Sequence, residues 1–159
     1  MNDFKSVSPS KMISNINLVF FALFSGQIFY LLAGLFLLQS GSGQGISGVN
    51  TIFMFIIPVV NVCLILAAKF IYEKNLSRFN KTLPLESKSQ SYQINNIIKL
   101  ALLEGANIIN ISAMIITSNY FFAALFVIII ALFLLNKPAK EKFIMEYEVA
   151  SDDVIKVLG

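Results

Sequence analysis

Glu104 is the residue in this sequence with the clearest capacity for chemistry, because it interrupts a long apolar stretch over residues 94–116. At about 1.5 Å of rise per residue, Glu104 lies roughly 15 Å along a helix that begins at residue 94. That depth is near the middle of a bilayer's hydrocarbon core, which is about 30 Å thick. An ionised carboxylate is costly there, so we expect Glu104 to be protonated or to face polar side chains inside a helix bundle.

Other polar side chains accompany Glu104 on the same predicted helix. At 100° per residue they fall within an arc of about 140° and form one polar stripe: Asn96, Lys99, Glu104, Asn107 and Asn110. Two other apolar stretches carry polar residues at comparable depth: Ser25, Gln27 and Asn61. A first hypothesis is structural: these side chains hold the helices together through interhelical hydrogen bonds, each contributing about 0.6–2 kcal/mol.

A second hypothesis is that Glu104 binds and releases a proton or a small monovalent cation. Acidic residues inside membranes commonly belong to ion pathways. The candidate ion-binding residues are then Glu104, Asn107, Gln27, Ser25 and Asn61. The sequence favours the structural hypothesis and leaves ion translocation as the alternative.

The residue content excludes most catalytic and metal chemistry. Histidine is absent and Cys63 is the single cysteine, so one chain cannot build a disulfide or a Cys/His zinc site. No nucleophile and base, and no pair of carboxylates, are spaced for catalysis. The segment Gly43–Gly48 matches GxGxxG, but it joins two apolar stretches rather than a strand and a helix. We therefore expect a protein that is not an enzyme, with no metal site and no cofactor.

The composition indicates that lipid surrounds most of the chain. Of the 159 residues, 57% are hydrophobic and 13% are charged, and the mean hydropathy is +0.76. Ordinary soluble chains are about 45–50% apolar and about 25% charged. Four stretches approach the roughly 20 residues that a membrane-spanning helix needs, at about 16–38, 51–72, 94–116 and 119–136. The sequence predicts an all-α, polytopic membrane protein, with a four-helix transmembrane domain over 1–136 and a cytoplasmic tail over 137–159 that contains a short helix.

The distribution of positive charge predicts the orientation. All twelve basic residues lie in the N-terminal arm, between the second and third spans, in the tail, or at the adjoining helix ends. The loops 39–50 and 117–119 carry no charge. The positive-inside rule then places both termini in the cytoplasm, with Lys69 and Lys99 extending toward that face. The net charge of +3 thus reflects orientation in a lipid bilayer, and we expect no binding of nucleic acid.

Small residues repeat in the two halves of the chain. Aligning ALFSGQIF (22–29) with ALLEGANI (101–108) superposes two alanine–glycine pairs, Ala22 and Gly26 on Ala101 and Gly105. Small residues four positions apart let helix backbones approach closely in lipid. The alignment predicts a duplicated unit, so that the four spans form two helical hairpins and these four residues mediate helix packing, within the chain, in a homo-oligomer or against a membrane-protein partner.

The tail suggests a short amphipathic helix. Ser151 is a suitable N-cap, and Asp152 and Asp153 follow it in the first turn. Such a helix would expose four apolar side chains, Val154, Ile155, Val157 and Leu158. We expect it to pack on the membrane face, and the alternative is that the tail docks a partner as part of an accessory subunit.

Two family resemblances follow from these motifs. Two hairpins with a single acid next to a glycine, in ALLEG (101–105), resemble the proteolipid (c or K) subunit of rotary ATPases, which implies proton or cation translocation through Glu104. Where proteolipids have dense glycine repeats, this chain has Phe20, Phe21 and Phe24. The order ALLEG, a short polar turn and NKPAKEKFIMEYEV (136–149) also resembles small four-helix membrane proteins of Bacteroidetes bacteria. That resemblance implies a multi-pass protein of the bacterial inner membrane and no particular activity.

Overall fold

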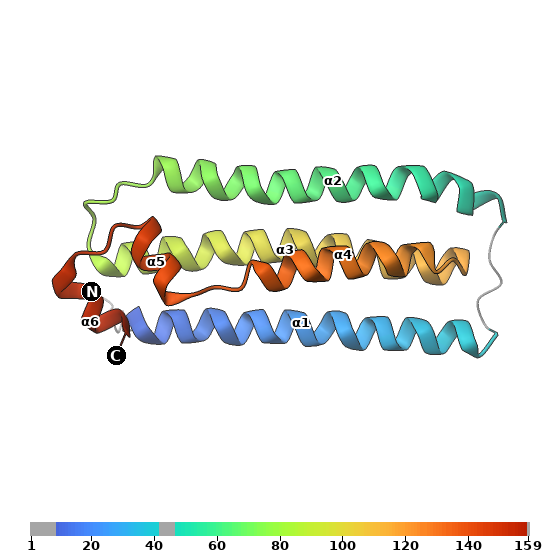
Figure 1. The fold of residues 1–159 in the computed structure, drawn as a ribbon, viewed down its shortest axis with the longest axis horizontal. Helices are drawn as coiled ribbons and strands as arrows, with labels where there is room; N and C mark the ends of the chain where they lie inside the picture. Colours follow the sequence, from blue (N-terminus) through green and yellow to red (C-terminus); the bar gives the residue numbers. More distant parts are fainter. Residues whose placement is uncertain (1–8, 42–46, 159) are drawn as a thin grey trace, which may run out of the picture.

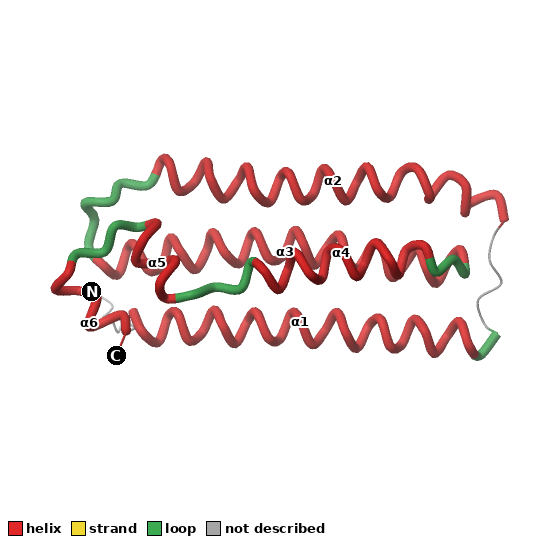
Figure 2. The backbone as a smooth tube through the Cα atoms, in the orientation of Figure 1, coloured by secondary structure: helices red, strands yellow, loops and turns green. Residues whose placement is uncertain are grey.

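The computed structural model describes residues 9–41 and 47–158, which form six helices and no strand. Three long helices lie side by side along the molecule: α1 (Pro9–Gln39), α2 (Ser47–Arg78) and α3 (Leu85–Thr117) (Figure 1). After α3, α4 (Phe121–Leu135) turns back along it, and two short helices, α5 (Lys140–Glu146) and α6 (Ser151–Leu158), cover one end. Short loops join the elements from α2 onward (Figure 2). The all-α prediction is therefore confirmed.

α3 is the central element of the bundle. It packs against α1, α2 and α4, whereas α1 and α2 are not in extensive contact with each other. Half of the most apolar window of α3 is buried, against 17% for the corresponding windows of α1 and α2. The prediction of two hairpins is thus correct for α3 and α4, which pack together, and wrong for α1 and α2. The physical reason is that α3 carries most of the mid-helix amides, which need partners on several sides.

The helices extend beyond the predicted spans, and the fourth is shorter. By length and composition, α1, α2 and α3 are each able to cross a membrane within the described residues. α4 has only 15 residues, or about 22 Å, and reaches spanning length only together with α5, from which it is bent by 70°. The bend occurs where Asn136 closes α4, with its side-chain amide bound to Leu132 O at 2.7 Å, and Pro138 follows.

The turn between α3 and α4 has a clear local cause. Ser118 adopts a left-handed conformation, with φ of 53°, and ends α3. Asn119 then accepts a hydrogen bond from the backbone N–H of Phe121 at 2.9 Å, which fixes the start of α4. The amide of Asn119 also donates to Asn50 Oδ1 at 2.8 Å and ties this turn to α2. The short polar turn predicted at 117–119 is therefore present.

Apolar side chains lie on the outside of the bundle as well as in its core. Two clusters of buried apolar side chains run along α3, one around Phe20, Leu103 and Phe133 and one around Ile111, Met114 and Phe126. Large apolar side chains also point outward on the other helices, for example Phe29 (72% exposed), Phe55 (74%) and Leu135 (82%). An exposed apolar surface spread over three helices is far larger than a water-soluble monomer tolerates.

The tail forms a cap on one end of the bundle, which we call the charged end and define by the loop 79–84, α5 and α6. Phe143, Tyr147 and Val157 are fully buried there against Tyr92 of α3. The Tyr92 hydroxyl donates to Ala139 O at 3.0 Å, and Lys88 donates to Glu148 O at 2.9 Å. These contacts tie the tail to the start of α3.

The last helix follows the prediction in part. α6 begins at Ser151, as expected, and packs against α1. The expectation that it exposes its apolar side chains is wrong for Val157, which is fully buried, and correct for Ile155, which is 77% exposed. Val157 is buried because it completes the aromatic cluster of the cap, which covers apolar surface that would otherwise face water.

Candidate functional site

Glu104 lies near the middle of α3, at the edge of the bundle. Its side chain is half-buried and, among the described residues, has no hydrogen bond or ion pair. It lines a cavity of about 320 Å³ between α1 and α3 together with Gly26, Gln27, Tyr30 and Ile108. Of the two alternatives expected for Glu104, polar partners inside the bundle are therefore not found among the described residues, and a protonated carboxyl group remains a prediction. Glu104 is at one edge of the polar stripe. Because α3 is oriented with Asn107 and Asn110 toward the interior, the carboxyl group of Glu104 points toward the outside.

The amides inside the bundle join α3 to both neighbours. Asn107 Nδ2 donates to Gln27 Oε1 of α1 at 2.6 Å, and Asn61 Nδ2 of α2 donates to Asn110 Oδ1 at 2.7 Å. All four side chains are buried. We call Gln27, Asn61, Asn107 and Asn110 the polar layer.

The five candidate ion ligands therefore do not converge. Of the other four, only Gln27 lines the cavity of Glu104, while Asn61 and Asn107 are engaged in interhelical bonds. Ser25 is exposed on α1. The structure thus pairs Gln27 with Asn107 and Asn61 with Asn110, and leaves Ser25 outside both pairs.

The polar layer leaves some of its atoms unpaired. Among the described residues, the donors Gln27 Nε2 and Asn110 Nδ2 and the acceptors Asn61 Oδ1 and Asn107 Oδ1 have no partner. Asn107 and Asn110 are three residues apart and share a helix face. Water, which both donates and accepts, suits such a set better than a cation, which needs several converging oxygens.

The small residues that the sequence singled out do not pack closely within the chain. Ala22, Gly26 and Ala101 are exposed, and Gly105 is half-exposed. A Cβ atom added at Gly26 or Gly105 would meet nothing within 4 Å, so the predicted packing role is wrong within one chain.

The close helix contact occurs instead at Gly34 of α1. A Cβ atom there would lie 3.2 Å from side-chain atoms of Ile111, Met114 and Ile115. Sequence reasoning missed Gly34 because it lies outside the aligned segment 22–29 that drew attention to Gly26. Its position within the apolar stretch 16–38 was the only available signal.

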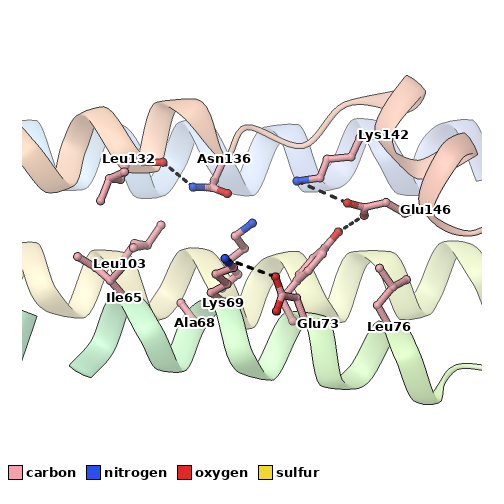
Figure 3. Close-up of a pocket in the computed structure, with 12 residues that line it drawn as sticks. Ile65, Ala68, Lys69, Glu73, Leu76, Leu103, Leu132, Asn136, Lys142 and Glu146 are labelled. Carbon is pink, nitrogen blue, oxygen red and sulfur yellow. Dashed lines mark hydrogen bonds and ion pairs between the residues drawn. The ribbon is translucent and has the colours of Figure 1, made fainter. Parts of the chain in front are cut away.

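A larger cavity, of about 540 Å³, lies at the charged end between α2 and the α4–α5 segment, with α3 as its third wall. Figure 3 shows Lys69 and Glu73 on the α2 side and Asn136, Lys142 and Glu146 on the opposite side. Deeper in the bundle the walls are apolar, formed by Ile65, Leu103 and Leu132. Sequence reasoning missed this site because Lys142 and Glu146 lie on α5 and reach the cavity only because α5 folds back.

Two ammonium groups share one aromatic ring in this cavity. Lys99 Nζ lies 4.5 Å and Lys142 Nζ lies 5.4 Å from the centre of the Tyr72 ring. The Tyr72 hydroxyl donates a hydrogen bond to Glu146. Lys69–Glu73 and Lys142–Glu146 are loose ion pairs at 3.8 Å. Within the described ranges Lys99 forms no such pair, although the charges of Glu146 and Glu73 act on it from farther away.

Polar contacts also hold the cap in place. Asn95 Nδ2 donates to the Tyr147 hydroxyl at 2.9 Å, and burial raises the pKa of Tyr147. Lys81 Nζ donates to a Glu148 carboxylate oxygen at 2.6 Å on the surface. This hydrogen bond and the charge of Lys81 lower the pKa of Glu148. The buried phenol of Tyr147 and the exposed Lys81–Glu148 pair thus add to the contacts of Tyr92 and Lys88 that hold the cap.

Comparison of the chain with family models, with curated proteins and with solved structures found no match.

Proposed function

We propose that this chain is a multi-pass integral protein of a bacterial inner membrane that works through helix association, without enzymatic chemistry. One observation carries the proposal: large apolar side chains face outward on α1, α2 and α4, while the amides of the polar layer pair inside. This distribution suits a lipid environment, where interhelical hydrogen bonds and close packing hold helices together. In this proposal α1, α2 and α3 each cross the membrane, and α4 with α5 forms a fourth, broken span.

The same proposal places both termini and the charged end in the cytoplasm. Lys74, Arg78 and Lys81 lie at the end of α2 and in the loop after it, on the same end as the cap. The turn at the opposite end, residues 118–120, has no charged side chain. This asymmetry supports the orientation through the positive-inside rule.

Alkaline carbonate extraction tests membrane integration. We expect the full-length protein to stay in the membrane pellet after the wash and to require detergent for release, because its exposed apolar surface is covered by lipid acyl chains. Recovery of folded, monomeric protein in the carbonate supernatant would contradict the proposal.

Proton or cation translocation through Glu104 is a second candidate function, favoured by one specific observation. The carboxyl group lacks a partner among the described residues and shares its cavity with Gln27, whose Nε2 is also unpaired. Carbodiimide reacts with protonated carboxyl groups in apolar surroundings. Under this hypothesis it labels the wild-type protein, and Glu104→Gln abolishes both labelling and ion flux without loss of insertion. Equal labelling of the two proteins would exclude Glu104 as the reactive acid.

A further inference from the structure

The cavity at the charged end has a gradient of polarity along the axes of its helices. On each of three helices, a polar residue at the mouth is followed one turn deeper by an apolar one: Lys69 and Ile65, Lys99 and Leu103, Asn136 and Leu132. Four residues of helix correspond to about 6 Å. A ligand that fits this arrangement has a charged group at the mouth and an apolar chain below it.

The charges at the mouth select an anion. Three ammonium groups against two carboxylates leave one positive charge in excess. The Nζ atoms of Lys99 and Lys142 both lie near the Tyr72 ring. Among the described residues Lys99 has no carboxylate within ion-pair distance, although Glu146 and Glu73 act on its charge from farther away. Two like charges held at one ring repel each other, and an anion placed between them removes this repulsion.

We propose that this cavity binds an anionic phospholipid, with the phosphodiester group between Lys99 and Lys142 and an acyl chain along Ile65, Leu103 and Leu132. The volume of about 540 Å³ accommodates a phosphate with part of its glycerol and the first methylene groups, and the remaining chain continues into the bilayer. Basic pockets between helices on the cytoplasmic side are suited to such headgroups. The inference rests on the proposed membrane insertion and orientation, because the lipid reaches the cavity from the cytoplasmic leaflet.

Native mass spectrometry of the delipidated full-length protein in detergent tests the proposal. The probes are phosphatidylglycerol and phosphatidylcholine with identical acyl chains, and inorganic phosphate alone. We expect retention of phosphatidylglycerol over phosphatidylcholine by the wild type. The Lys99→Gln/Lys142→Gln variant should weaken phosphatidylglycerol binding about 30-fold, since each lysine near an anionic headgroup contributes about five-fold.

Two control variants separate loss of the site from loss of the fold or of net charge. Lys74→Gln removes a charge at the same end, where Lys74 lies over the Phe70 ring outside the cavity, and should bind like the wild type. Lys99→Arg/Lys142→Arg keeps both charges and should retain at least a tenth of the wild-type affinity. If the glutamine and arginine double variants bind equally weakly, the charges are not the determinant and the proposal is overturned.

The remaining outcomes also decide the question. Equal binding by the wild type and the glutamine double variant, or equal retention of both lipids by the wild type, overturns the inference. Saturation of the site by inorganic phosphate at concentrations where lipid does not bind overturns the lipid assignment. Carbonate extraction of the same proteins keeps the two proposals distinct. Retention in the pellet without lipid selectivity refutes only the lipid site, whereas release into the supernatant refutes membrane integration.

Discussion

The hydrogen bond between Gln27 and Asn107 gives a quantitative test of how the polar layer holds the bundle. The bond is 2.6 Å long, and both side chains are buried. Replacing Gln27 with Met, of similar length, leaves the Asn107 amide without any partner among the described residues. Replacing Asn107 with Leu does the same to Gln27. Each single variant should therefore lose about 1–3 kcal/mol, the cost of a buried polar group left unpaired.

The double variant Gln27→Met/Asn107→Leu removes both polar groups together. We expect it to be closer to the wild type than the sum of the single variants, because replacing both partners by apolar groups of similar shape is nearly neutral. The coupling energy should therefore be about 2 kcal/mol or more, because two single losses of at least about 1 kcal/mol each are absent from the double variant. Reversible unfolding in mixed micelles of mild detergent and dodecyl sulfate measures all four proteins. Ser25→Ala, at an exposed position on the same helix, is the control and should change stability by less than about 0.5 kcal/mol. Additive single effects, with no coupling, would refute the pairing.

Two further predictions concern packing and pH. Gly34→Leu should destabilise the protein by about 1–3 kcal/mol, since even a Cβ atom would lie 3.2 Å from three side chains. Gly26→Leu should be tolerated in the monomer, because a Cβ atom there meets nothing within 4 Å. Equal losses of stability for the two variants in the same unfolding assay would contradict the assigned close contact at Gly34. Lys81 lowers the pKa of Glu148, so their interaction stabilises the fold above the unfolded-state pKa of about 4.3 and is lost as the pH falls through the lower folded-state value. The melting temperature of Glu148→Gln should therefore lie below that of the wild type at pH 7, and the difference should shrink as the pH falls through the lowered pKa of Glu148. A difference that does not shrink in acid would exclude the Lys81–Glu148 pair as its source.

The fold class and the approximate helix positions could be predicted because they depend on local properties. Runs of apolar residues, the uncharged turn at 117–119 and Ser151 as a helix start are all readable in short windows of sequence. The central position of α3 in the bundle is harder to predict from the sequence. Amides at Asn107 and Asn110 indicate that this helix needs partners, but not which helices supply them.

The arrangement of the sites could not be predicted, because it depends on how the helices are rotated and where the chain bends. The rotation of α3 decides that Asn107 points inward while Glu104, three residues earlier, lies at the edge. The cavity at the charged end requires Lys142 and Glu146 to return to Lys99, more than 40 residues away, which follows from the bend after Asn136. The alanine–glycine repeat drew attention to Gly26, but close packing depends on which helix face meets a neighbour, and that face carries Gly34.

Cysteine labelling in spheroplasts tests most directly whether lipid surrounds the bundle with its charged end in the cytoplasm. In a Cys63→Ser background, single cysteines replace three exposed residues: Tyr120 near the α3–α4 turn, Glu86 at the charged end and Val127 on α4. With a membrane-impermeant maleimide, we predict that Tyr120→Cys is labelled in intact spheroplasts, Glu86→Cys only after lysis, and Val127→Cys in neither case. Labelling of Glu86→Cys before lysis would contradict the orientation, and ready labelling of Val127→Cys, 61% exposed in the isolated chain, would contradict membrane insertion itself.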